Sequence, residues 1–293
     1  MSFDELSIAE KKILLYIACF FKGRDRRYVT RILDSCGFKA GNGITKLIEK
    51  SFLTITKGRV HMHDLIQEMS RCIARKDYPN TMAWVTQEIK ETLKTSSRLE
   101  AVEAIVETNH DQSSGRPMPY CSAKVFMGMK KLRLLEVNNY FTSSEPAAFP
   151  EELRWLCWSD YPYQSLIITR GMTNLVGLEL PYSDILQVQM EKEVILTSLK
   201  SINLNRSYMI TSFPDISGVP NLERLNLSCC MQLREVHQSV LNHEKIIHLD
   251  LTGCMSLRSL PSPIKMKNLS RHSFLIIVKI SKDYQKSPWR QGG

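Results

Sequence analysis

The chain has 293 residues, a formal net charge of +9 and 43% hydrophobic residues, which is typical of a globular protein. It opens on the acidic segment Met1–Glu5, and its longest apolar runs, Ile13–Phe21 and Phe274–Val278, are far shorter than the roughly 20 residues that cross a bilayer. Its eight cysteines form no C-x-x-C pair, which argues against a zinc site or a disulfide framework. We therefore expect no membrane span and a protein of the cytoplasm or the nucleus.

Residues 1–90 have the pattern of a winged-helix domain. The first predicted helix is Ile8–Gly23, where Ser7 and Glu10 have the spacing of a capping box. Two further helices, a hairpin and a closing helix are predicted over Arg26–Cys36, Ile44–Lys50, Phe52–Met62 and Asp64–Ala74. This region holds 16 Lys or Arg against 10 Asp or Glu, an excess that suits either phosphate binding or ordinary solvation.

A leucine-rich repeat recurs in the second half of the chain. After residues 91–125, which we expect to form a linker and an N-terminal cap strand, the template L-x-x-L-x-L occurs six times at steps of 21 to 24 residues. Its first positions are Leu132, Leu153, Leu175, Leu199, Leu222 and Ile246. Residues 126–270 are therefore predicted to form a solenoid, and the fold class is a multidomain α+β chain: a winged helix followed by an α/β horseshoe.

Residues between the repeated leucines should face outward from the concave sheet of such a solenoid. A mixed polar strip of this kind suits protein recognition. Cys230 and Cys254 recur at one repeat position and are expected to be structural, between adjacent coils. The candidate partner-binding residues are Trp155, Ser159, Glu179, Asn203, Asn205, Arg224, Asn226, Ser228, His248, Asp250 and Thr252.

The repeat pattern breaks near residue 270. A seventh unit should begin at Leu269, but His272 stands where an apolar residue belongs. We expect residues 271–293 to be a divergent tail that either covers the exposed end of the solenoid as an improvised strand or is disordered.

Several longer segments resemble plant disease-resistance proteins that combine nucleotide-binding and leucine-rich-repeat domains, of the class with an N-terminal Toll/interleukin-receptor domain. They occur in the order found in that family and span about residues 5–270. The resemblance implies a second ARC subdomain, which is a winged helix, followed by the repeats. The segments are Ile17–Gly23, Ile32–Phe38, Gly43–Leu53, Met62–Met69, Val102–Ile105, Leu153–Pro162 and Phe213–Leu225, with Trp84 between them.

The resemblance also implies a nucleotide-state sensor at Met62, His63 and Asp64, because the family's Met-His-Asp motif lies against bound ADP. An imidazole at a helix start can donate a hydrogen bond to a phosphate oxygen, and Asp64 could cap the helix. The sequence contains no G-x-x-x-x-G-K-[ST] loop to cradle phosphates, although the full-length family binds ADP or ATP. We expect no bound cofactor, no ATPase activity and at most weak ADP binding from this chain.

Three functions remain open from the sequence. The first is an immune receptor segment that is not an enzyme and binds a protein: a pathogen effector, a guarded host protein or a full-length receptor. The second is a basic winged helix that binds DNA, which is less favoured because the basic helix Arg26–Cys36 also carries Ile32 and Leu33. The third is a non-functional product of a truncated receptor gene. No nucleophile motif such as G-x-S-x-G supports an enzyme.

Overall fold

A computed structural model describes residues 3–84, 86–94, 96–107, 121–138, 142, 144–146, 148–258 and 260. It divides into two compact units. The first comprises the described residues up to Val137 together with those from Thr142 to Leu156, and the second continues from Cys157. The tail beyond residue 260, including the predicted break at Leu269, lies outside the described residues.

The first unit begins with the predicted winged helix. Ser7 and Glu10 form the expected capping box, in which the Ser7 hydroxyl accepts from the Glu10 N–H at 3.3 Å. The helix ends before Gly23, which has φ +82. The helical elements of this domain before the hairpin are η1 (Phe3–Glu5), α1 (Ile8–Tyr16), the π-helix η2 (Ile17–Phe21), α2 (Arg26–Ser35) and α3 (Ala40–Glu49).

Helix α3 starts four residues before the predicted Ile44, although Gly41 and Gly43 are poor helix formers. Packing explains the difference. A Cβ atom on Gly43 would lie 2.3 Å from the Cδ1 of Ile13 in α1, so the absence of a side chain lets the two helices approach. The Asp34 carboxylate also accepts the Ala40 N–H at 2.7 Å, at the start of α3.

A two-residue turn closes the hairpin of β1 (Thr54–Thr56) and β2 (Arg59–His61). Lys57 and Gly58 both have positive φ, as the favoured primed hairpin turns require. The chain then enters α4 (Asp64–Asp77), three residues longer than predicted.

The parallel sheet begins earlier than the repeat pattern indicates. Strand β3 (Met82–Ala83) pairs with β4 (Ala104–Val106), which pairs with β5 (Leu134–Asn138). Strand β3 falls in the range assigned to the winged helix, whereas β4 falls in residues 91–125, where a linker and an N-terminal cap strand are expected. Neither follows L-x-x-L-x-L spacing, so the repeat search could not find them. Short helices lie between these strands: α5 (Thr86–Lys94), α6 (Ser96–Leu99) and α7 (Val125–Gly128).

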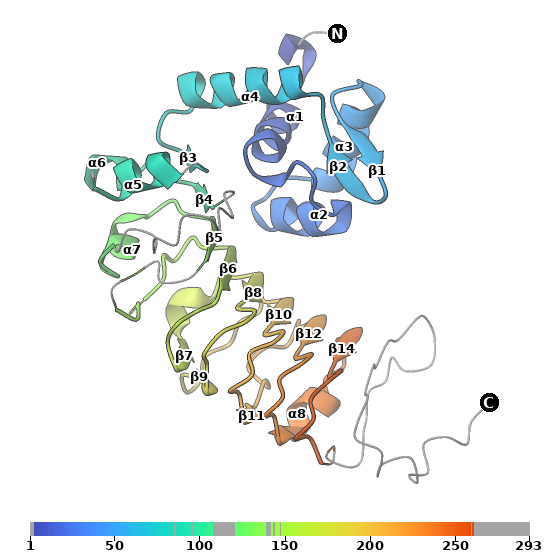
Figure 1. Ribbon diagram of the computed structural model, residues 1–293, viewed down its shortest axis with the longest axis vertical. Helices are drawn as coiled ribbons and strands as arrows, with labels where there is room; N and C mark the ends of the chain where they lie inside the picture. Colours follow the sequence, from blue (N-terminus) through green and yellow to red (C-terminus); the bar gives the residue numbers. More distant parts are fainter. Residues whose placement is uncertain are drawn as a thin grey trace, which may run out of the picture. The chain divides into compact units, whose positions relative to one another are not determined.

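All six predicted repeats contribute a strand. The strand order of the sheet, β3-β4-β5-β6-β8-β10-β12-β14, follows the chain (Figure 1). Equivalent repeat residues stand in register, since Ile202 faces Leu178 on one side and Leu225 on the other, and Leu225 faces Leu249. The remaining repeat strands are β6 (Trp155–Ser159), β8 (Gly177–Glu179), β10 (Ser201–Asn203), β12 (Arg224–Asn226) and β14 (His248–Asp250).

Two small parallel sheets, β7·β9 and β11·β13, accompany the main one. The sequence pattern does not predict these sheets, because strands of two to four residues carry too little periodicity. Their bounds, with those of the short helices of these repeats, are β7 (Ser165–Ile168), η4 (Arg170–Met172), β9 (Gln187–Met190), β11 (Ser212–Phe213), β13 (Glu235–Val236) and α8 (Gln238–Leu241).

After the last five repeat strands, β6 to β14, the chain passes through a left-handed residue at one fixed repeat position. These residues have φ between +53 and +75, and the N–H of Tyr182, Arg206 and Cys229 each donates to a carbonyl of the next coil. Only the last of the five is a glycine, which adopts this conformation at no steric cost. The five are Asp160, Tyr182, Arg206, Cys229 and Gly253.

The two repeat cysteines are structural, as predicted. Cys230 and Cys254 are buried, and each thiol donates to a carbonyl of the preceding coil: Cys230 to Leu204 at 3.2 Å and Cys254 to Leu227 at 3.0 Å. Burial raises the pKa of the Cys230 thiol to about 12. Both are therefore neutral hydrogen-bond donors inside the solenoid at physiological pH.

Candidate functional site

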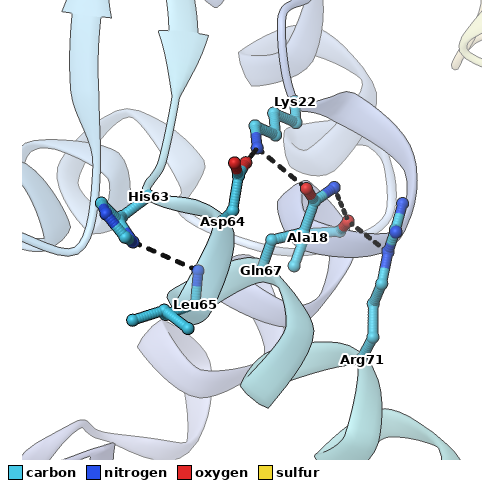
Figure 2. Close-up of polar contacts among 7 residues, drawn as sticks. All are labelled: Ala18, Lys22, His63, Asp64, Leu65, Gln67 and Arg71. Carbon is cyan, nitrogen blue, oxygen red and sulfur yellow. Dashed lines mark hydrogen bonds and ion pairs between the residues drawn. The ribbon is translucent and has the colours of Figure 1, made fainter.

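His63 caps α4. Its Nδ1 atom accepts the N–H of Leu65 at 3.2 Å (Figure 2). The expectation that Asp64 would cap the helix is wrong, because Asp64 is the first residue inside it. Since Nδ1 is an acceptor, the neutral ring must carry its proton on Nε2. The His63 side chain is exposed, whereas Met62 before it is buried at 6% exposure and anchors the end of the hairpin.

Asp64 pairs with Lys22, whose ammonium also donates to the side-chain oxygen of Gln67 at 2.9 Å (Figure 2). The hydrogen bond from Lys22 is the largest cause of a lowered pKa at Asp64, so the carboxylate stays ionised at neutral pH. The carboxylate is largely exposed, and its structural role is to hold Lys22 beside the first turn of α4.

The π-helix η2 supplies a second attachment for α4. The carbonyl of Ala18 accepts from Gln67 Nε2 at 3.0 Å and from Arg71 Nε at 3.2 Å (Figure 2). In a π-helix the backbone hydrogen bonds skip one residue further than in an α-helix, and such turns are frequent at functional sites. Two turns of α4 are thus fixed to η2. Lys22 and Gln67 lie within the segments Ile17–Gly23 and Met62–Met69 that carry the resemblance, but neither residue was singled out as a site residue, and Arg71 lies in no quoted segment.

The repeat sheet gathers nine of the eleven predicted partner-binding residues into three neighbouring columns on β8, β10, β12 and β14. The register places Glu179, Asn203, Asn226 and Asp250 in the first column. Arg224 and His248 lie in the second, two residues earlier in their strands. The third column directly follows the strands and holds Asn205, Ser228 and Thr252.

Several of these side chains also hold the strand ends. The side-chain oxygens of Asn203, Asn226 and Asp250 accept the backbone N–H two residues later, at 3.0, 2.9 and 2.9 Å. The Nδ2 of Asn205 donates to the hydroxyl of Ser228 at 2.6 Å. A turn of this type suits Asn and Asp, whose short side chains reach their own backbone. The first column therefore has a structural role in addition to any role in recognition.

Trp155 is buried, although the sequence predicts it to be exposed on the outward-facing strip. Its side chain is 1% exposed, and its ring meets the edge of Tyr28 from α2 at 6.0 Å between ring centroids. Its indole N–H has no hydrogen-bond partner among the described residues. The Tyr28 ring packs against the Trp155 ring, so Trp155 is a packing residue in this conformation. Ser159, the other remaining candidate, is half-buried.

Within the part of the chain that the structure describes, no group of three or more His, Cys, Asp or Glu could hold a metal ion, so His61 and His63 belong to no such group. Among the described helices, none combines the length and apolar character needed to span a bilayer.

Comparisons with known proteins agree with this architecture. Residues 7–77 match the family model of the winged-helix domain of Roq1-like disease resistance proteins. TMV resistance protein N of Nicotiana glutinosa is 33% identical over 265 residues, covering 89% of this chain. Disease resistance protein RPP2A of Arabidopsis thaliana is 32% identical over 92% of the chain, and disease resistance protein RUN1 of Vitis rotundifolia is 34% identical over 83%.

The chain spans 23%, 21% and 20% of the lengths of these three relatives. Among solved structures, the leucine-rich repeat domain of the type III effector XCV3220 (XopL) aligns over 95% of the chain with 14% identity and a TM-score of 0.48. The assignment of a leucine-rich-repeat sheet rests on the strand register described above and not on that likeness.

Proposed function

Because the chain belongs to the plant disease-resistance proteins, as a winged helix joined to leucine-rich repeats, we propose that it acts in immune signalling by binding and switching rather than by catalysis. The observation that carries this proposal is the set of polar columns on the repeat sheet. The partner is a protein: a pathogen effector, a guarded host protein or a full-length receptor. The site of action is the cytoplasm or the nucleus.

The second column is the best candidate for partner contact. Arg224 and His248 stand directly opposite each other in register, and both side chains are half-buried rather than covered. Arginine is enriched at the centres of protein interfaces because its planar head makes several directed hydrogen bonds. Glu179 is only 7% exposed, so it contributes charge to this surface more than contact area.

Reversing charge in this column should abolish partner binding. We expect Arg224→Glu to remove a set of proteins from those recovered by proximity labelling in plant tissue, because a carboxylate would repel groups that matched the guanidinium. Lys192→Glu makes the same change of charge at an exposed residue outside the columns and should leave the set intact. Identical protein sets from wild type and Arg224→Glu would refute recognition by this column.

The start of α4 supports the second part of the proposal, a nucleotide-state sensor at Met62, His63 and Asp64. The His63 ring keeps one N–H donor for a ligand, and it stands at a helix N-terminus that favours anions. Lys22 is already engaged by Asp64 and Gln67. The His63 ring N–H and the N-terminus of α4 suit a single phosphate group, such as the β-phosphate of ADP. The bound nucleotide would supply the negative charge that they recognise. Other phosphate contacts would come from outside this chain.

Two substitutions separate capping from phosphate binding. His63→Ala should cost about 1 kcal/mol of unfolding free energy through loss of the cap, and it should also remove any response to ADP. His63→Asp keeps a good capping residue and hence stability, but its negative charge should repel the diphosphate. The measurement is the NMR shift of the Leu65 backbone amide, which every variant retains, during ADP titration to about 1 mM, a range set by the weak affinity expected of few contacts. If adenosine, which lacks phosphate, gives the same shift as ADP, the sensor assignment fails.

A further inference from the structure

A second surface of the winged helix carries a concentration of positive charge. The first turns of α2 and the hairpin turn lie together, because the N–H of Arg26 donates to the carbonyl of Gly58 at 2.8 Å. The backbones of Asp25 and Arg59 also pair as an isolated antiparallel β-bridge. We use the name basic surface for the five cationic residues of these segments: Arg26, Arg27, Arg31, Lys57 and Arg59.

The charge of the basic surface is not balanced by ion pairs with carboxylates in the part of the chain that the structure describes. Elsewhere in the same domain Lys22 pairs with Asp64, and Lys46 and Lys50 both pair with Glu10. Within the described residues, no member of the basic surface forms an ion pair with a carboxylate. Asp25 is the nearby acid, and its side chain accepts the N–H of Tyr28 at 3.0 Å as the cap of α2.

Three of the arginines are held in place. Arg26 donates to the hydroxyl of Thr45 in α3 at 3.1 Å, and Arg59 donates to the carbonyl of Gly23 at 2.8 Å. The guanidinium of Arg31 stands 5.9 Å from the centre of the Tyr28 ring. Side chains that are ordered before binding lose less conformational entropy when a ligand arrives. Arg27 and Lys57 are exposed beside them and can adjust to a partner.

We propose that the basic surface binds an acidic segment of a partner protein, at residues distinct from those of the repeat columns and of the α4 start. Four of its five cations are arginines, whose planar heads accept carboxylates in two parallel hydrogen bonds. The local charge is complementary to a run of Asp or Glu. This interaction goes beyond the proposed function, which places recognition on the repeats.

The geometry favours an acidic protein segment over nucleic acid. In a helix-turn-helix the second helix enters the major groove and reads base edges. That helix is α3, whose exposed residues are Asn42, Thr45, Lys46 and Glu49. Lys46 is its one cation, and it is paired with Glu10. Glu49 would repel phosphates, so the helix that should face the groove is unsuited to it.

The test is fluorescence anisotropy with the full 293-residue chain and a fluorescein-labelled peptide of alternating Glu and Gly. The double substitution Arg27→Glu with Lys57→Glu should weaken peptide binding at least about tenfold at low salt. The matched control, Lys131→Glu with Lys192→Glu, changes the net charge equally at exposed positions and should weaken it less than about twofold. Arg27→Lys should weaken peptide binding about threefold, because lysine keeps the positive charge but lacks the planar guanidinium that makes two parallel hydrogen bonds to a carboxylate.

Two outcomes would overturn the proposal. The first is an equal loss of peptide binding in the test and control variants, which would show that net charge alone is responsible. The second is tighter binding of a labelled DNA duplex than of the peptide at the same salt, with the same loss on Arg27→Glu and Lys57→Glu, which would assign the surface to nucleic acid. Circular dichroism of every variant shows whether the fold is retained.

Discussion

Leu225→Ala should destabilise the repeat unit by about 3 to 4 kcal/mol. Leu225 is fully buried at the centre of β12, and it faces the equivalent residues Ile202 and Leu249 of the two neighbouring coils. Removing a buried leucine side chain loses its transfer free energy and leaves a cavity, and such substitutions cost 2 to 5 kcal/mol in general. Because each coil contacts only its neighbours, the loss weakens two interfaces at once.

Urea unfolding followed by circular dichroism measures this effect, with the free energy taken from the midpoint and slope of the transition. Ile247→Ala is the matched control, since Ile247 lies in the same repeat as β14 and is 46% exposed. It should change the unfolding free energy by less than about 0.5 kcal/mol. Equal effects at the two positions would mean that the buried leucines do not hold the coils together.

Gly218→Ala should cost about 3 kcal/mol for a different reason, which is steric. A Cβ atom on Gly218 would lie 2.4 Å from the carbonyl oxygen of Val194, and backbone cannot move aside as a side chain can. The same region is tied by the N–H of Leu196, which donates to the Gly218 carbonyl at 2.7 Å. Overpacking of this kind typically costs 1 to 3 kcal/mol, and displacement of a hydrogen-bonded backbone segment adds to it.

Gly41→Ala in α3 is the opposite case and serves as control. The nearest atom to its added Cβ would be 4.0 Å away, which is an ordinary contact. Alanine is a better helix former, so this variant should be more stable by about 0.5 to 1 kcal/mol. Thermal unfolding of both variants would show a lower midpoint for Gly218→Ala and a higher one for Gly41→Ala. A Gly218→Ala protein as stable as wild type would exclude the backbone contact with Val194.

Periodicity predicted the parts of the fold that repeat. The leucine spacing gave all six repeat strands, because burial of one residue type at a fixed interval is visible in a single sequence. The capping box at Ser7 and the stop at Gly23 were likewise local signals. Strand β3 was missed, and the cap strand β4 was expected only somewhere within residues 91–125, because the pairing of both strands depends on the sheet that follows them. The early start of α3 was missed because tertiary packing at Gly43 outweighs weak helix propensity.

The candidate sites were predicted unevenly for similar reasons. Strand alternation predicted that these polar residues share columns, as the register shows, but Glu179 and Ser228 are buried. It also could not show that Asn203 and Asn226 would accept backbone N–H groups. Alternation also predicted an outward Trp155, and the Tyr28 ring covers it. At the start of α4 a motif pointed to His63, whereas its neighbours Lys22 and Arg71 come from contacts distant in sequence. Such contacts leave no pattern that one sequence can reveal.

The buried thiols allow separation of the solenoid coils to be followed by chemical labelling. Cys230 and Cys254 donate hydrogen bonds inside the solenoid, whereas Cys72 on α4 is exposed. The thiolate form of a cysteine attacks an alkylating reagent, so the reagent should modify Cys72 in the native protein and reach the two repeat cysteines only when the coils separate. Mass spectrometry of timed labelling could then follow the repeats with no added probe. Loosening of the solenoid by a bound partner would register as faster alkylation at two known positions.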